Sequence, residues 1–168
     1  MQLSFKEILL KRISKKDNEL LRTWRNSEFI SNKMFFQKKI SKEMQTEWFE
    51  SLSSENDFYF LIQYQQENIG LINLKNIDWK QKEGEAGLYI AIEKYRNSPL
   101  AIYASMAFLT YFFEEKGLDN IFAKVRKDNL STIQYNKDLG FIALEKELFS
   151  LTREKYFEIT KKLQKRIL

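Results

Sequence analysis

The stretch 89–108, YIAIEKYRNSPLAIYASMAF, joins the end of a strand, a short loop and the beginning of a long apolar helix. Ser98 is a favourable helix N-cap, and Pro99 suits the first helical position because the N–H group that proline lacks would be unpaired there. We therefore predict a strand over residues 85–93, a loop over 94–99 and a helix over 100–116, which Gly117 ends.

The apolar spacing outside this stretch predicts further strands and helices. A helix begins near Asp17 or Asn18, and Ser41 caps a second one. The predicted strands are 3–13, 57–65, 69–77, 119–126, 141–150 and 154–163, and a short helix spans 129–139. The strands on either side of the long helix must run parallel. The fold class is therefore mixed α/β (α+β), and because linkers and repeats are missing we predict a single domain over residues 1–168.

The composition excludes several classes of protein. The chain has 168 residues, of which 43% are hydrophobic and 15% aromatic, which is enough to build a core. It contains no Cys and no His, so thiolate nucleophiles, the Ser-His-Asp triad and Cys- or His-based metal sites are excluded. We expect no metal, and any chemistry must use carboxylates, Tyr, Lys, hydroxyls, backbone groups or a bound cofactor.

The net charge is +5 and the isoelectric point is near 9.2, which favours anionic partners such as phosphates and nucleotides. The Lys and Arg residues are interspersed with Asp and Glu along the chain, so an ordinary solvated surface explains the net charge equally well. The sequence shows neither a signal peptide nor an apolar run of about 18 residues, and we expect a soluble cytoplasmic protein without a membrane contact.

The start of the long helix is a candidate site for an anion. The free N–H groups of Leu100 and Ala101 lie at the positive end of the helix dipole, and Arg96 stands three residues before Pro99. A phosphate group would fit there. The alternative is an ordinary capped helix, because every helix has such a terminus.

Two motifs resemble the GNAT superfamily of N-acetyltransferases. The superfamily pattern Arg/Gln-x-x-Gly-x-Gly/Ala is similar to residues 96–101, RNSPLA, with Pro99 in the place of the first Gly. The pattern Asn-x-x-Ala/Ser-x-x-x-Tyr-x-x-x-Gly-Phe is similar to residues 129–141, NLSTIQYNKDLGF. The order of elements also matches. The resemblance implies a mainly antiparallel sheet of about seven strands with four helices, splayed between the fourth and fifth strands.

The resemblance also implies acetyl-CoA as co-substrate. The backbone of the strand before the loop would pair with the pantetheine arm, because a splayed strand exposes unpaired amides. The residues implied to bind acetyl-CoA are Ile90, Ala91, Ile92, Arg96, Asn97, Ser98, Leu100, Ala101, Asn129 and Asn136.

An acceptor amine must lose a proton to attack the thioester, and Glu85 lies eleven residues before Arg96, where some superfamily members carry a catalytic Glu. We predict Glu85 as the base, with a solvent-facing strand residue as the alternative. The superfamily Tyr that protonates the departing thiolate would fall at Asn136. Tyr135 is adjacent but is rotated by about 100° around the helix, so the acid is Tyr135, another group or water.

The region before residue 53 resembles bacterial N-acetyltransferases of UDP-4-amino sugars, such as that of the pseudaminic-acid pathway, in Trp24-Arg25-Asn26 and Met34. Residues 85–89, EAGLY, are similar to the central strand of the same subgroup. The residues implied to bind the amino-sugar nucleotide are Arg25, Met34, Phe35 and Tyr89. Arg25 suits a phosphate, and the Met and Phe side chains suit a base or a deoxysugar methyl. The alternative is that Arg25 pairs with an acid and that the aromatic residues belong to the core.

The leading hypothesis is thus direct acetyl transfer from acetyl-CoA to the amine of a nucleotide-linked amino sugar. The alternative acceptor is a protein or peptide N-terminus, because acetyltransferases of ribosomal-protein N-termini also show Trp-Arg-Asn. A non-catalytic nucleotide- or RNA-binding module is the alternative of another class, but no RNA-binding motif is present and nucleic acid is not the expected partner. A homodimer remains open.

Overall fold

The computed structural model describes residues 1–167. The strands are β1 (Gln2–Phe5), β2 (Ile8–Arg12), β3 (Phe58–Tyr64), β4 (Glu67–Asp78), β5 (Glu83–Ile90), β6 (Asn120–Lys124), β7 (Ile142–Ala143) and β8 (Leu148–Thr152). The helices are α1 (Asn18–Asn26), α2 (Glu28–Ser31), α3 (Lys42–Ser51), α4 (Leu100–Thr110), α5 (Leu130–Asp138) and α6 (Arg153–Ile167). The helix predicted over 100–116 is α4 extended by a π-helical turn, Tyr111–Glu115.

The eight strands of the described chain form one sheet in the order β1-β2-β3-β4-β5-β6-β8-β7. All neighbouring strands are antiparallel except β5 and β6, which are parallel. The connection between these two contains α4, as a parallel crossover requires. The predicted fold class, a mixed and mainly antiparallel sheet, is confirmed.

The parallel pair is short. Glu83–Ala86 of β5 pairs with Asn120–Ala123 of β6, and β5 then continues to Ile90 while β6 ends at Lys124. The last four residues of β5 therefore have a partner strand, β4, on one edge only. The predicted splay lay between the fourth and fifth predicted strands, 85–93 and 119–126, which correspond to β5 and β6.

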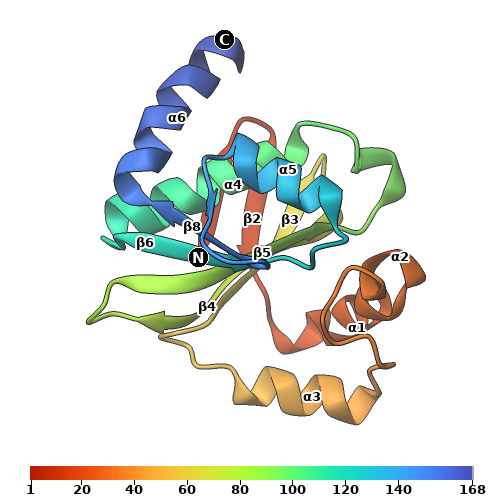
Figure 1. Ribbon diagram of the computed structural model, residues 1–168. Coiled ribbons are helices and arrows are strands. Elements are labelled where there is room, and N and C mark those ends of the chain that lie inside the picture. Colours follow the sequence, from red (N-terminus) through yellow and green to blue (C-terminus); the bar gives the residue numbers. More distant parts are fainter. Residues whose placement is uncertain (168) are drawn as a thin grey trace.

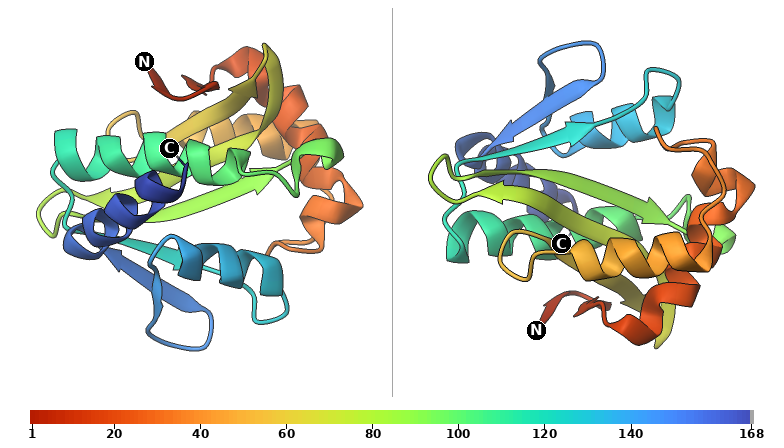
Figure 2. Two further views of the ribbon diagram at one scale, coloured as in Figure 1. Left: turned by 90° about the horizontal axis from the view of Figure 1, so that it is seen from above. Right: turned by 90° about the horizontal axis from the view of Figure 1, so that it is seen from below.

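Helices cover both faces of the sheet, with α4, α5 and α6 on one face and α1, α2 and α3 on the other (Figures 1 and 2). The larger core lies under α4, where Phe108 and Phe112 pack edge-on against the β3 residues Phe60 and Phe58. The smaller core lies under α1 and α3 and consists of Leu21, Trp24, Tyr59, Leu61 and Leu71. Since β3 supplies both cores, its residues Phe58 to Ile62 are all buried.

Two predicted strands differ from the structure. The segment 3–13 is split into β1 and β2 by a turn in which Lys6 has a φ of 51°. The segment 154–163 is not a strand but belongs to α6. Tyr156 and Thr160 are spaced by four residues and both are buried, and Glu158 pairs with Lys155 and Lys162, so the pattern has the helical period.

None of the described helices combines the length and the apolar character that are needed to cross a membrane.

Gly140 ends α5 with a φ of 97°, and a Cβ at this position would lie 2.9 Å from Cγ1 of Ile159 in α6. Gly117 has a φ of 71° but has no atom within 4 Å of such a Cβ. We expect Gly117→Ala to lower the free energy of unfolding by about 1–2 kcal/mol through backbone strain alone. Gly140→Ala should lower the free energy of unfolding by ~1–3 kcal/mol more than Gly117→Ala does, because of the clash with Ile159. Urea unfolding measures both, and equal losses would contradict the packing of α5 on α6.

Candidate functional site

A cleft of about 940 Å³ opens where β5 and β6 part. Its lining comes from both sides of the sheet: α1, α2, α3 and the loop between α2 and α3 on one side, α4 and α5 on the other. Residues of β4, β5 and β6 form its middle. The cleft therefore connects the two faces of the sheet through the gap between the strands.

The open edge of β5 presents backbone groups to this cleft. The Ala91 N–H donates to the Ile69 carbonyl of β4 at 2.7 Å. Because N–H groups alternate between the two edges of a strand, those of Leu88 and Ile90 point away from β4 and toward the gap. The Ile92 N–H also donates to Ile69, at 3.3 Å, which makes a bulge.

This arrangement corrects one expectation. Unpaired amides were expected at Ile90, Ala91 and Ile92, yet the N–H groups of Ala91 and Ile92 are bonded within the sheet. Ile90 lines the cleft, and Ala91 and Ile92 do not. The backbone available to a ligand thus lies at Ile90 and at the preceding residues of β5.

Arg96 is held at the end of β5. Its guanidinium donates to the carbonyls of Ala91 at 2.8 Å and Ile90 at 3.4 Å, and it stacks 3.4 Å from the ring centroid of Phe29. Arg96 therefore ties the end of β5 to α2 while it lines the cleft. The hydrogen bonds described for its guanidinium go to backbone carbonyls at the end of β5.

The helix α4 begins at Leu100, where the predicted helix begins, but Pro99 is its N-cap and not its first helical residue. Pro99 occupies the N-cap position, and the Ser98 hydroxyl accepts from the Leu100 N–H at 3.4 Å. Ala101 lines the cleft, whereas Asn97 is exposed and lies outside the lining, as do Ser98 and Leu100. Of the residues predicted here, Ala101 is the one that the helix brings to the cleft.

Glu85 lies in the middle of the sheet rather than at a solvent-facing edge. Its carboxylate is paired with Lys75 of β4 at 3.2 Å and with Lys124 of β6 at 3.3 Å. The side chain is 20% exposed. It lies on the same face of β5 as Gly87 and Tyr89, which is the face covered by α1 and α3.

Arg25 and Tyr89 place two unpartnered polar atoms in the cleft. Nη1 of Arg25 and the hydroxyl of Tyr89 are buried and have no hydrogen-bond partner. Burial lowers the pKa of the Arg25 guanidinium and raises the pKa of Tyr89. Burial also raises the pKa of the neighbouring Tyr59 to about 12. A partner for these donors must come from outside the described chain.

Two tryptophans support these tyrosines. Trp24 packs edge-on against Tyr89 with 6.3 Å between the ring centroids, and Trp48 packs edge-on against Tyr59 at 5.1 Å. Trp48 itself lines the cleft. Trp24 is buried, and its contact supports the Tyr89 ring.

Exposed apolar side chains gather at the mouth of the cleft. Phe29, Phe35, Phe36 and Met44 are 39%, 56%, 45% and 40% exposed, and all four line the cleft together with Met34. The aromatic residues of this loop are therefore surface residues and not core. A concentration of exposed apolar surface is a feature of binding sites.

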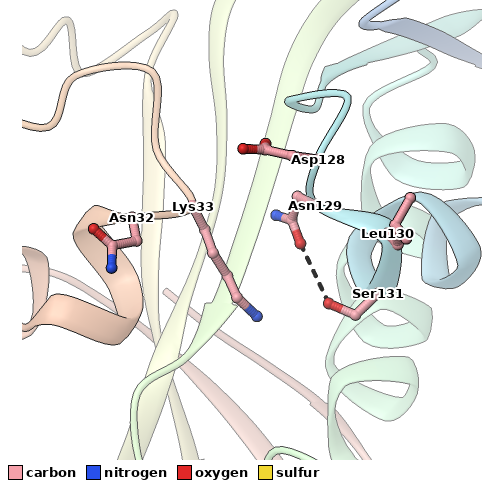
Figure 3. A pocket seen from close by; sticks show the side chains of 6 residues that line it. All are labelled: Asn32, Lys33, Asp128, Asn129, Leu130 and Ser131. Atoms are coloured by element: carbon pink, nitrogen blue, oxygen red, sulfur yellow. Dashed lines mark hydrogen bonds between the residues drawn. The ribbon is translucent and has the colours of Figure 1, made fainter.

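Lys33 extends from the loop after α2 toward the first turn of α5 (Figure 3). The space between them measures about 300 Å³ and is lined by Asn32, Lys33, Asp128, Asn129, Leu130 and Ser131. Burial and the nearby Arg96 lower the pKa of Lys33. Asn129, predicted as the first residue of this helix, is its N-cap and accepts from the Thr132 N–H at 3.4 Å.

Tyr135 and Asn136 lie side by side on α5 but differ in environment. The Tyr135 hydroxyl is hydrogen-bonded to the Ser105 hydroxyl and lies 3.4 Å from the Ala101 carbonyl, and burial raises its pKa. Asn136 is 5% exposed, and its Nδ2 has no partner. Both residues line the cleft.

Sequence reasoning missed several residues of the cleft. Lys75 and Lys124 reach Glu85 only through the strand register, and Ser105 reaches Tyr135 only because α4 lies beside α5. The one available signal was Ser105 itself, a hydroxyl inside an apolar helix. In the described residues, no group of three or more His, Cys, Asp or Glu side chains could hold a metal ion.

A model of the family described as "Acetyltransferase (GNAT) domain" matches residues 7–142. No curated protein matches the chain in sequence. Among solved structures, the apo form of FdhC, described as a nucleotide-linked sugar GNAT, is 19% identical with a TM-score of 0.80, covering 98% of this chain and 97% of that chain. The spermidine N-acetyltransferase of Vibrio cholerae in complex with CoA and spermine is 18% identical with a TM-score of 0.79, covering 91% and 99%. A domain from Methanocaldococcus jannaschii is 21% identical with a TM-score of 0.75, covering 86% and 97%. At these identities the likeness concerns the fold.

The unpartnered hydroxyl of Tyr89 leads to a test on stability. Because a buried donor without an acceptor destabilises the fold, Tyr89→Phe should leave the free energy of unfolding unchanged or raise it by up to about 1 kcal/mol. The control is Tyr156→Phe, whose hydroxyl is bonded to Thr110 at 2.7 Å and to the Met106 carbonyl at 3.1 Å. This control should lose about 1–2 kcal/mol. A similar loss in both variants would show that Tyr89 has a partner within the protein.

Proposed function

We propose that this chain, which belongs to the acetyltransferase (GNAT) domain family, transfers the acetyl group of acetyl-CoA to the amine of a nucleotide-linked amino sugar. The family match covers most of the chain, and the protein is an acetyl-CoA-dependent N-acetyltransferase. The proposal concerns the acceptor.

The charge of the cleft carries this proposal. In the described chain, its lining contains the cations Arg25, Lys33, Lys75, Arg96 and Lys124 and one carboxylate, Glu85. Such a site repels a polyamine and attracts an anion. The two structural neighbours differ in their acceptors, since one is a spermidine N-acetyltransferase and the other a nucleotide-linked sugar GNAT. The positive charge of the cleft favours the nucleotide-linked sugar.

The unpartnered groups support the same acceptor. The Arg25 guanidinium can donate two parallel hydrogen bonds to a phosphate, and the Tyr89 hydroxyl can donate another. The exposed Phe35 and Met34 at the mouth provide apolar surface for a nucleobase or a deoxysugar methyl. A peptide N-terminus, the alternative acceptor, carries no phosphate for this guanidinium.

Glu85 is the proposed base. It lies where the cleft crosses the sheet, and no other carboxylate among the described residues lines the cleft. It can therefore take the proton from the acceptor ammonium directly or through water. Lys75 and Lys124 hold its two oxygens in place. The acetyl group then passes directly to the amine.

The direct test is a CoA-release assay with acetyl-CoA and a panel of acceptors: UDP- and dTDP-linked amino sugars, spermidine, and an N-terminal peptide. We expect turnover on a nucleotide-linked amino sugar, with a KM that rises with salt because the acceptor is an anion. Turnover confined to spermidine or to the peptide would overturn the proposed acceptor.

Arg25→Met tests the phosphate contact, since it keeps the apolar stem and removes the guanidinium. We expect the KM for the nucleotide-linked sugar to rise about tenfold or more, because hydrogen bonds to charged groups contribute ~1.5–3 kcal/mol. The KM for acetyl-CoA should not change. The matched control is the same amino sugar without its nucleotide, whose KM should be equal in both proteins; an equal increase for both sugars would refute the contact.

Glu85→Gln tests the base. General base catalysis contributes about 10²–10⁴-fold, so kcat should fall by roughly this factor while the affinity for acetyl-CoA is kept. Glu83→Gln is the matched control, because Glu83 lies two residues earlier on the same face of β5 but outside the cleft. An unchanged kcat between pH 6 and 9 would exclude Glu85 as the base.

A further inference from the structure

Lys33 is a cleft amine that no carboxylate of the described chain holds. The described lining of the cleft contains three lysines, Lys33, Lys75 and Lys124. Lys75 and Lys124 are both paired with Glu85, at 3.2 Å and 3.3 Å. Among the described residues no carboxylate lies within ion-pair distance of Lys33, and the charge that acts on it, that of Arg96, has the same sign. Its ammonium is therefore not neutralised.

Asp128 faces Lys33 but is bound to another residue. It is the acid in the described lining of the space between the loop after α2 and the start of α5, and Lys33 extends into this space (Figure 3). The two carboxylate oxygens of Asp128 accept from Nε and Nη2 of Arg126, at 3.0 Å and 2.7 Å. This pairing lowers the pKa of Asp128. The carboxylate is thus held by Arg126 and not by Lys33.

Phe29 holds the amine of Lys33 near the end of β5. Nζ of Lys33 lies 4.0 Å from the ring centroid of Phe29, and Cζ of Arg96 lies 3.4 Å from the same centroid. Arg96 in turn donates to the carbonyls of Ile90 and Ala91. The shared ring therefore brings the amine close to the last residues of β5, which border the gap in the sheet.

These surroundings make Lys33 a better nucleophile than a fully solvated lysine. Burial and the positive charge of Arg96 lower its pKa, so a larger share of the amine is neutral near neutral pH. A lysine that is desolvated or lies beside another cation is a recurring nucleophile in covalent chemistry. The residue is only partly buried, so the amine keeps its access to the cleft.

We propose that Nζ of Lys33 is acetylated by the acetyl-CoA that the protein itself binds. The cleft has to bring an acetyl group to an amine, and Lys33 is the lysine of its described lining that is not engaged in an ion pair. The proposal rests on the use of acetyl-CoA and does not depend on which amine is the external acceptor. The product is a neutral amide, which removes one positive charge from the cleft.

The self-acetylation balances. The ammonium of Lys33 loses one proton to water, and the neutral nitrogen attacks the thioester carbon; the C–N bond forms and the C–S bond breaks. The electron pair of the C–S bond stays on sulfur, and the thiolate takes up a proton from solvent. The nitrogen releases a second proton as the amide forms. The products are acetylated Lys33, CoA and one proton in excess.

The test incubates the full chain with acetyl-CoA and no acceptor and follows each lysine by peptide mass spectrometry. We expect an acetyl group on Lys33, formed at a rate that levels off as the acetyl-CoA concentration rises. Lys38 and Lys39 are the matched controls, because they lie on the same loop, are exposed and do not line the cleft. Lys33 should react about tenfold or more faster than either control, since a bound donor acts at a high effective concentration.

Desulfo-CoA, in which hydrogen replaces the thiol, separates reaction with a bound donor from acetylation in free solution. An excess of desulfo-CoA should suppress the acetylation of Lys33 and leave the slow acetylation of Lys38 and Lys39 unchanged. Lys33→Arg keeps the positive charge and removes the nucleophile. The rapid gain of one acetyl group in the intact mass should therefore disappear in this variant.

Three results would overturn the proposal. Lys33 could react no faster than Lys38 and Lys39, its rate could still rise linearly at acetyl-CoA concentrations that saturate a thermal shift, or desulfo-CoA could leave its rate unchanged. In each of these cases acetyl transfer to an external amine, measured as CoA release, can stand. The absence of any thermal shift with acetyl-CoA would overturn the self-acetylation together with the acetyl-CoA-dependent activity on which it rests.

Discussion

The short parallel pairing of β5 with β6 is the constraint on which the rest of the structure depends. Four residue pairs hold the two strands together, and beyond Ala86 they part. A parallel pair requires a long crossover connection, which here contains α4. The cleft is therefore a consequence of the topology. It connects a side lined by α4 and α5 with a side lined by α1 and α3.

The fold was predictable where one pattern had one explanation. Ser41, Asn129 and Gly117 marked helix ends because capping and a positive φ are local properties. The C-terminal segment was misassigned because its alternating apolar residues also fit a helix, and the packing of Tyr156 against α4 decides between them. The turn at Lys6 depends on a positive φ in a residue that rarely adopts one, so no sequence rule indicated it.

The site was predictable by position rather than by contact. The residues expected around the cofactor and the acceptor mostly line one cleft, since motif spacing fixes which element carries them. Their partners depend on register and packing. Lys124 reaches Glu85 across a strand pair, and Arg96 turns back to the carbonyls of β5 because Phe29 covers it. Neither contact has a trace in local sequence.

The pairing of tryptophans with cleft tyrosines gives the protein its own optical reporter. Trp24 and Trp48 contact Tyr89 and Tyr59 on the side of the cleft lined by α1 and α3, whereas Trp79 is 38% exposed and donates to the Glu55 carbonyl. A ligand on this side changes the surroundings of the first two indoles and leaves the third in solvent. Intrinsic fluorescence can therefore follow this one side of the cleft, with quenchers such as iodide suppressing the exposed indole of Trp79.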